Sequence, residues 1–172
     1  MPFSWSAFIG PAPIRSERSE QVMRLLWIGL RPGRDQPVIE PQSADLRVGA
    51  GIVGDRFKPS KGSKREVTLL LTPQIETISA AIGHVIPYAM LRRNLVIETD
   101  VDQLCSAQRY RLGDALIEIT GTCPPCGRMR EKIGDPGFRA MRGRGGFTAR
   151  VIREGRIRID DPLILLGNDT SD

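Results

Sequence analysis

The sequence predicts a single domain that is mainly β and barrel-like, with a few short helices. The 172 residues include 18 glycines and 13 prolines, together about 18% of the chain, whereas the average share of these two residues is roughly 12%. This excess indicates many turns and short strands. Several short segments alternate apolar and polar residues, as a strand with one buried face does. Only one segment has the apolar spacing of a clear helix.

The chain length favours one domain, large enough to bury a core without disulfides or a structural metal. We expect residues 1–21 to be an N-terminal extension, residues 22–167 to form the domain and residues 168–172 to be a polar tail. No apolar run approaches the roughly 20 residues of a membrane helix, and the N-terminus lacks the pattern of a secretory signal. We therefore expect a cytoplasmic protein with no membrane contact and with reduced cysteines.

The expected strands follow in chain order. Residues 22–30 (VMRLLWIGL) form the first strand, and residues 31–62 are a loop-rich segment interrupted by prolines and glycines. Residues 66–71 (EVTLLL) have the length and composition of a buried strand, and residues 94–98 (NLVIE) form another. Residues 112–120 (LGDALIEIT) alternate with period two and predict one strand with a buried face.

The clearest helix follows the buried strand. Thr72 is expected as its N-cap, Pro73 occupies its first position, and Gly83 ends it. Its apolar residues recur at spacings of three and four and form one stripe: Ile75, Ile78 and Ile82. A second, shorter helix is expected over residues 126–133, where a proline precedes the start and apolar residues again share one face.

The C-terminal part predicts a hairpin. Residues 149–152 form one arm, Glu154 and Gly155 the turn, and residues 156–159 the other arm, in which Arg and Ile alternate. Residues 163–166 add a last strand.

Residues 49–54 match the pattern G-x-G-x-x-G, which in dinucleotide-binding proteins opens a helix on a pyrophosphate. Pro59 and Gly62 would break a helix that followed, so the sequence argues against a dinucleotide site. The glycines are better explained by positive φ angles or by a close backbone approach.

The segment Cys123-Pro-Pro-Cys126 is the most informative motif, and three interpretations compete. A zinc site needs four ligands, but only Cys105 and His84 remain, and neither has ligand spacing. A thioredoxin-like dithiol belongs in a βαβ unit, whereas this motif follows a period-two strand. In the third interpretation, Cys126 lies in the first turn of helix 126–133, where N–H groups, the helix dipole and two arginines stabilise a thiolate. Cys126 is then a nucleophile or a soft metal ligand, and Cys105 is structural.

The net charge is +5, and 21 of the 25 basic residues are arginines. The planar donor fork of arginine suits phosphate and carboxylate oxygens, which favours an anionic ligand, although a GC-rich genome would give the same excess. Aromatic residues are only 5%, which disfavours binding of single-stranded nucleic acid by base stacking. The basic residues gather in three clusters: Lys61, Lys64 and Arg65; Arg92 and Arg93; and Arg139, Arg142 and Arg144 with interleaved glycines.

Six short motifs, in one order, resemble those of the MOSC domain family (molybdenum cofactor sulfurase C-terminal domain) in its stand-alone bacterial form. The similarity extends from about residue 22 to residue 166. It rests on GAGIVGD (49–55), KREVTL (64–69), RRNLVI (92–97), LGD (112–114), TCPPC (122–126), and RGRGG (142–146) followed by ARV (149–151).

The resemblance implies a β barrel with a pocket that ends at Cys126 and binds a molybdenum cofactor (molybdopterin), a small anionic group. In the family this cysteine carries sulfur for the cofactor, or ligates molybdenum in proteins that reduce N-hydroxylated compounds; stand-alone members are linked to resistance against hydroxylated purine analogues. The residues that would bind the cofactor, the basic ones through its phosphate, are Lys64, Arg65, Arg92, Asn94, Arg142 and Arg144. We expect no pyridoxal-phosphate sulfurase domain in this chain, which would then need a partner or a loaded cofactor; the partners expected are a cysteine desulfurase or a redox protein.

Two other functions remain open. One is a non-enzymatic basic barrel that binds an anion or a nucleic acid; its binding would weaken steeply as the salt concentration rises and would not need Cys126. A CxxC dithiol redox protein would need Cys123 and Cys126 equally.

Overall fold

The structure is a computed structural model, which describes residues 23–60 and 62–166. The expected extension (1–21) and tail (168–172) lie outside the described residues.

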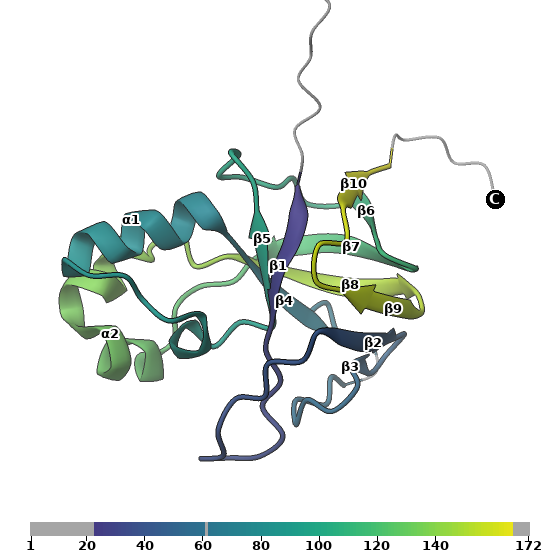
Figure 1. The fold of residues 1–172 in the computed structure, drawn as a ribbon, viewed down its shortest axis with the longest axis horizontal. Coiled ribbons are helices and arrows are strands. Elements are labelled where there is room, and N and C mark those ends of the chain that lie inside the picture. The colour runs from purple at the N-terminus through teal and green to yellow at the C-terminus, as the bar shows by residue number, and fades with distance from the viewer. Residues whose placement is uncertain (1–22, 61, 167–172) are drawn as a thin grey trace, which may run out of the picture.

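Seven strands form one sheet that curls into a nearly closed barrel (Figure 1). Their order is β1 (Arg24–Ile28), β5 (Leu95–Glu98), β4 (Val67–Leu71), β8 (Phe147–Arg153), β7 (Ala115–Thr122), β6 (Arg109–Leu112) and β10 (Leu163–Leu165). All neighbours are antiparallel except β4 and β5. Leu25 bonds β1 to the turn before β10, because its N–H donates to Asp161 O at 2.9 Å and its carbonyl accepts the N–H of Asp160 at 2.8 Å. The predicted mainly β, barrel-like fold is confirmed.

A second sheet of three strands crosses one end of the barrel. It consists of β3 (Gly51–Ile52), β2 (Ser43–Arg47) and β9 (Gly155–Arg158), in that order. The segment 31–62, expected to be loop-rich, contributes two of these strands, β2 and β3. A Cβ at Gly51 would overlap Glu66 O, and its φ is +77°, so this glycine of the G-x-G-x-x-G motif does permit a close backbone approach, as predicted.

The predicted C-terminal hairpin is wrong. β8 pairs with β7 and β4, whereas β9 pairs with β2. Gly155 crosses the turn at Asp114 so closely that a Cβ would overlap the backbone there, and this crossing carries the chain to the other sheet. The alternation of Arg and Ile correctly indicates that Ile157 is buried, but it carries no information about the partner strand.

The predicted strand 112–120 is two strands. Gly113, with φ +55°, and Asp114 turn the chain between β6 and β7, so that Leu112 pairs with Ala115. Within β7 the expected alternation holds, with Ala115, Ile117 and Ile119 buried.

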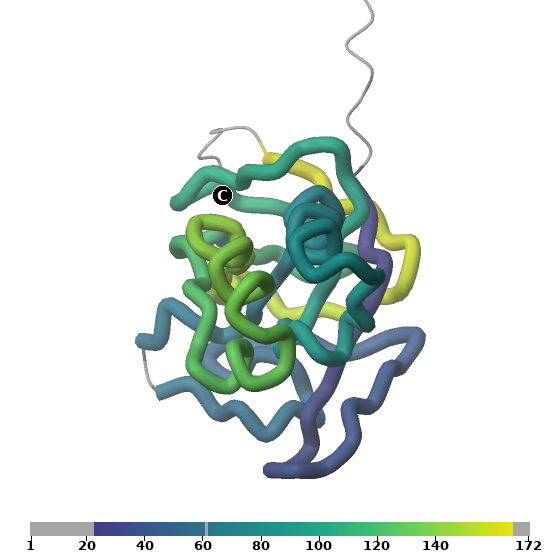
Figure 2. The backbone as a smooth tube through the Cα atoms, turned by 90° about the vertical axis from the view of Figure 1, so that its left-hand side faces the viewer, coloured from purple at the N-terminus to yellow at the C-terminus, as the bar shows by residue number. Residues whose placement is uncertain are grey.

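Both expected helices are present, and they lie against each other on one side of the barrel (Figures 1 and 2). The helix α1 (Thr72–Ile82) begins one residue earlier than predicted: its N-cap is Leu71, whose N–H donates to Gln74 Oε1 at 3.2 Å, and Thr72 instead donates its hydroxyl to Thr99 O at 2.9 Å. The helix α2 (Gly127–Ala140) runs past the predicted end and kinks at Gly134. A short 3₁₀ helix, η1 (Tyr88–Leu91), precedes β5. No described helix has the length and apolar character that crossing a membrane requires.

The core has two parts, one inside the barrel and one between the sheet and the helices. β4 is buried along its whole length, because Leu69 and Leu71 face the barrel interior while Leu70 packs against the helix side. This explains the continuous apolar run in the sequence.

Candidate functional site

The strand register brings four connections to one edge of the barrel. Ile28 pairs with Leu95, Leu95 with Leu69, Leu69 with Phe147, and Phe147 with Thr122. The segments that adjoin this row, 29–31, 92–94, 144–146 and 123–126, therefore leave the barrel side by side.

Cys126 lies in one of these segments, where the barrel meets α2. Cys123 is buried, and its N–H donates to Gly146 O at 2.8 Å. The two prolines that follow carry the chain to the surface, where Cys126 is exposed. Cys126 is the N-cap of α2 rather than part of its first turn, and its carbonyl accepts the N–H of Met129 at 2.8 Å. Cys105 is exposed too.

A buried arginine holds the segment that carries both motif cysteines. Arg93, only 3% exposed, donates from Nε to Gly145 O at 2.7 Å and from Nη2 to Cys123 O at 3.1 Å. Burial lowers the pKa of Arg93, and the nearby thiols of Cys123 and Cys126 oppose that effect. Longer contacts, at 3.5 Å, reach the carbonyls of Pro124, Leu91 and Arg92. One guanidinium therefore ties three segments together beside the CPPC motif.

Cys126 lines a cavity of about 120 Å³. The guanidinium of Arg65 lies 5.6 Å from the ring centroid of Phe57, a cation–π contact in the cavity wall. The wall holds five guanidinium groups and only two carboxylates, so it suits an anion. Besides Cys126, its lining residues are Arg31, Arg56, Arg65, Arg92, Arg93, Asp55, Glu66, Phe57, Thr68, Asn94 and Pro124.

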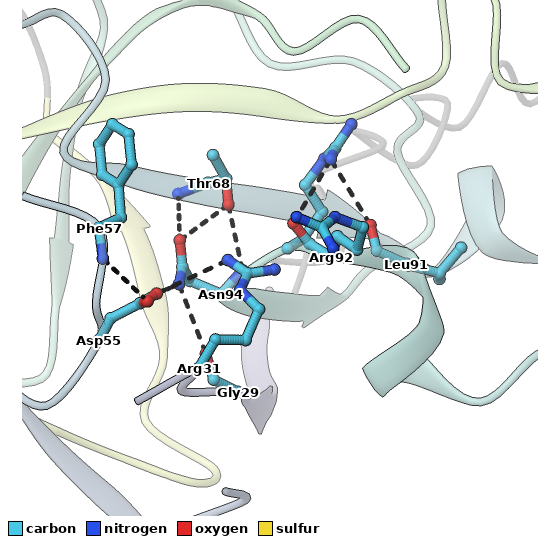
Figure 3. A network of polar contacts seen from close by, with 9 residues as sticks. Gly29, Arg31, Asp55, Phe57, Thr68, Leu91, Arg92 and Asn94 are labelled. Carbon is cyan, nitrogen blue, oxygen red and sulfur yellow. Dashed lines mark hydrogen bonds and ion pairs between the residues drawn. The ribbon is translucent and has the colours of Figure 1, made fainter. Parts of the chain in front are cut away.

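Asn94 links neighbouring strands in this wall (Figure 3). Its Oδ1 accepts the hydroxyl of Thr68 at 2.8 Å and the Thr68 N–H at 3.2 Å. Its Nδ2 donates to Gly29 O at 3.4 Å and to the carboxylate of Asp55. Because both ends of the amide have protein partners, Asn94 positions Asp55 and leaves its own amide committed.

Asp55 in turn holds Arg31 (Figure 3). The Asp55 side chain is only 4% exposed; its Oδ2 lies 3.6 Å from Arg31 Nη2, and its Oδ1 accepts the N–H of Phe57 at 3.3 Å. Burial lowers the pKa of Arg31, and Asp55 opposes this. Three neighbouring guanidinium groups lower it further: Arg92, Arg56 and Arg65. One buried carboxylate thus lies within a group of four arginines.

The structure brings four of the predicted site residues to this cavity: Arg65, Arg92, Asn94 and Cys126. Lys64, Arg142 and Arg144 are exposed and do not line it. The loop that contains Arg142 and Arg144 reaches the site through its backbone, because Gly145 O accepts the bond from Arg93.

Several residues of the wall have little or no distinctive signal in the sequence. Arg31 follows β1, far from Cys126 in the chain, and no local pattern marks it. Arg93 belongs to a basic pair in which the sequence predicts only Arg92 for the site, and the structure places both in the wall. Asp55 directly follows the last glycine of the glycine-rich motif, and an acidic residue at that position is the signal by which the sequence could have indicated it.

The barrel is nearly closed and presents an exposed cysteine beside a cavity walled by arginines, a lining that suits an anionic ligand. The family model that matches is the MOSC domain, over residues 56–164. The chain therefore belongs to the MOSC domain family, which is associated with the molybdenum cofactor.

Solved structures share this fold. The YuaD protein from Bacillus subtilis is similar with a TM-score of 0.74 and 17% identity, over 84% of this chain and 95% of that one. YiiM from Geobacillus stearothermophilus gives 0.67 and 18%, over 87% and 77%. YiiM from Escherichia coli gives 0.65 and 18%, over 86% and 72%. Among curated proteins, none matches this chain significantly.

Proposed function

We propose that this chain binds a molybdenum cofactor (molybdopterin) in the Cys126 cavity and that the Cys126 thiol acts directly on it. Two forms of action suit one thiol: ligation of molybdenum in a reductase of N-hydroxylated compounds, and transfer of sulfur to a molybdenum centre. The observation that carries the proposal is an exposed thiol in a wall of five arginines. The family supports it, and we place the protein in the cytoplasm, where thiols stay reduced.

The cavity residues fit such a group. Thiolate is a ligand that soft metals select, and Cys126 supplies it. Arginine binds phosphate with two parallel hydrogen bonds. Among the described residues, Arg65 and Arg92 have no carboxylate within ion-pair distance. Their donors are therefore available to the phosphate of the cofactor.

The bound cofactor would supply the two-electron redox chemistry that protein side chains lack. The residues of this chain would bind and orient it. Arg65 and Arg92 would hold the phosphate, and Asp55 would keep the neighbouring Arg31 in place. Arg93 would fix the segment that carries Cys126, so that the sulfur keeps one position relative to the phosphate site.

In the sulfur-carrier form, the Cys126 thiolate attacks the outer sulfur of a donor persulfide. The new S–S bond forms as the S–S bond of the donor breaks, and the donor leaves as a thiolate. The donor would be a pyridoxal-phosphate enzyme such as a cysteine desulfurase, whereas the reductase form needs a redox partner that supplies electrons. The exposure of Cys126 makes the thiol accessible to either protein.

The test is molybdenum and pterin content after expression in a host that makes the cofactor and purification without oxygen. Wild type is expected to contain both, and Cys105→Ser, which changes an exposed cysteine outside the cavity, is expected to equal it. Cys126→Ser is expected to lose molybdenum if the thiol is the ligand. If the thiol is the carrier, wild type is expected to gain the mass of one sulfur atom after incubation with a persulfide donor, and Cys126→Ser is expected to show no such gain. An active Cys126→Ser variant with unchanged metal content would refute both forms.

Cys123→Ser separates the proposal from a dithiol redox protein. Cys123 is 1% exposed, so the proposal expects its loss to be tolerated better than the loss of Cys126. Equal damage by the two substitutions would favour the dithiol. A basic barrel without thiol chemistry would bind anions in a salt-dependent manner, and neither substitution would change its anion affinity.

A further inference from the structure

A second, larger cavity adjoins the Cys126 cavity. Its volume is about 430 Å³, within the range of small-molecule sites. Arg31, Arg56 and Arg92 line both cavities, so the two share a wall. The rest of its lining comes from the connection between β1 and β2, from η1 and from α2: Gly33, Arg34, Asp35, Gln36, Val38, Ala89, Arg128, Glu131 and Lys132.

The lining of this second cavity is strongly cationic. Six basic side chains face two carboxylates, Asp35 and Glu131. Of the six, only Arg31 has an ion pair among the described residues. On the barrel surface, by contrast, Arg109 and Arg150 share Glu118, and other arginines pair with single aspartates. Five cations of the second cavity thus have no carboxylate partner among the described residues.

Backbone strain is concentrated at the same place. Four described residues other than glycine have positive φ, and two of them, Asp35 (φ +60°) and Arg92 (φ +54°), line this cavity. Arginine has no local side-chain hydrogen bond that favours this region, so the conformation is strained. Arg92 is the C-cap of η1, so the left-handed conformation also ends that helix. Here it places the Arg92 guanidinium in the wall that the two cavities share.

Mutual repulsion adds to this strain. Arg31 is held beside Arg56 and Arg92, and burial together with these neighbours lowers its pKa. A bound dianion would relieve the repulsion between these guanidinium groups, because it would supply negative charge that the two carboxylates of the cavity do not. A phosphate group has the charge and the number of acceptor oxygens for several guanidinium forks at once.

We propose that the second cavity binds the phosphate group of a small-molecule substrate, through Arg34, Arg128, Lys132 and the shared Arg92. The inference rests on the proposed function in one respect, which is that the ligand lies next to the Cys126 thiol and is therefore its substrate. The substrate class is a phosphate monoester or diphosphate of a small organic molecule. The apolar part of that molecule would contact Val38 and Ala89.

The experiment measures binding of pyrophosphate and of a nucleoside monophosphate by calorimetry, with the unphosphorylated nucleoside as comparison. Wild type is expected to bind both phosphates saturably and the nucleoside at least about tenfold more weakly. The double variant R128A/K132A is expected to lose at least about tenfold in affinity for both phosphates. The control R130A/R139A removes two cations from the same helix, outside the cavity, and is expected to change affinity by less than about twofold.

One further variant separates this inference from the proposed function, and a second tests the arginine that both cavities share. Cys126→Ser, which tests the thiol, is expected to bind pyrophosphate as wild type does. Arg92→Asn is expected to weaken pyrophosphate binding while raising the melting temperature, because asparagine adopts the left-handed conformation more readily. The inference is overturned if wild type binds neither phosphate, if both double variants weaken binding equally, or if cofactor-loaded protein no longer binds the phosphates. The last result would assign the cavity to the phosphate of the cofactor.

Discussion

Replacement of Arg93 by methionine tests whether one buried guanidinium holds the thiol segment in place. Methionine fills a similar volume and removes every donor. It leaves the carbonyls of Gly145 and Cys123, now bonded at 2.7 and 3.1 Å, without partners. The three contacts at 3.5 Å are too long to contribute much.

The expected cost follows from these two carbonyls. A buried acceptor left without a partner costs about 1–3 kcal/mol, so two give about 2–6 kcal/mol. Removal of a buried cation recovers part of its desolvation penalty, which Arg93 carries because it is 3% exposed. We therefore expect Arg93→Met to lower the free energy of unfolding by about 2–4 kcal/mol.

Urea unfolding monitored by circular dichroism measures this loss, and the slope against urea shows whether the variant still unfolds in one step. Arg93→Lys keeps the charge with fewer donors and is expected to lose less. Hydrogen exchange at the Cys123 amide, which is bonded to Gly146 O, is expected to accelerate in Arg93→Met. A loss below about 1 kcal/mol with unchanged exchange at Cys123 would show that the guanidinium does not anchor the segment.

Two more predictions concern stability. Gly51→Ala is expected to lower the free energy of unfolding by about 2–5 kcal/mol, from strain plus overpacking, because φ is +77° and a Cβ would overlap Glu66 O. The control is Gly49→Ala, where φ is +72° and a Cβ would meet open space, and the expected loss is only about 1 kcal/mol. Similar melting temperatures for the two variants would contradict the overlap at Gly51. Burial, with nearby Cys105, raises the pKa of Tyr110 above its usual 10.0. The folded protein therefore keeps the phenol proton longer than the unfolded chain does, and stability decreases as pH rises above about 10; Tyr110→Phe is expected to flatten that decrease in urea unfolding, and an unchanged slope would refute the assignment.

Local patterns predicted the parts of the fold that depend on neighbouring residues. The apolar stripe of Ile75 and Ile78 identified α1, and the two prolines before Cys126 identified the start of α2. The partner of a strand is not local information. The alternating residues around Ile157 are equally compatible with pairing to β8 and to β2, and only the crossing at Gly155 decides between them.

The candidate site shows the same limit more sharply. Cys126 could be singled out because its surroundings in the sequence, a diproline and a helix start, are chemically distinctive. Arg31 could not, because its role arises from the register that places Ile28 level with Leu95. Asn94 could be recognised from its motif, but its motif did not reveal that its amide is committed to Thr68 and Asp55.

The strand register therefore explains why a cysteine and several arginines from distant segments share one barrel edge. Each segment there leaves a paired strand, and Asn94 and Arg93 bond these segments to one another. An edge fixed in this way can keep like charges close together and a residue such as Arg92 in a strained conformation. A flexible surface would let the arginines separate into solvent. The paired strands of the barrel thus hold arginines from distant segments in one cavity wall beside the Cys126 thiol.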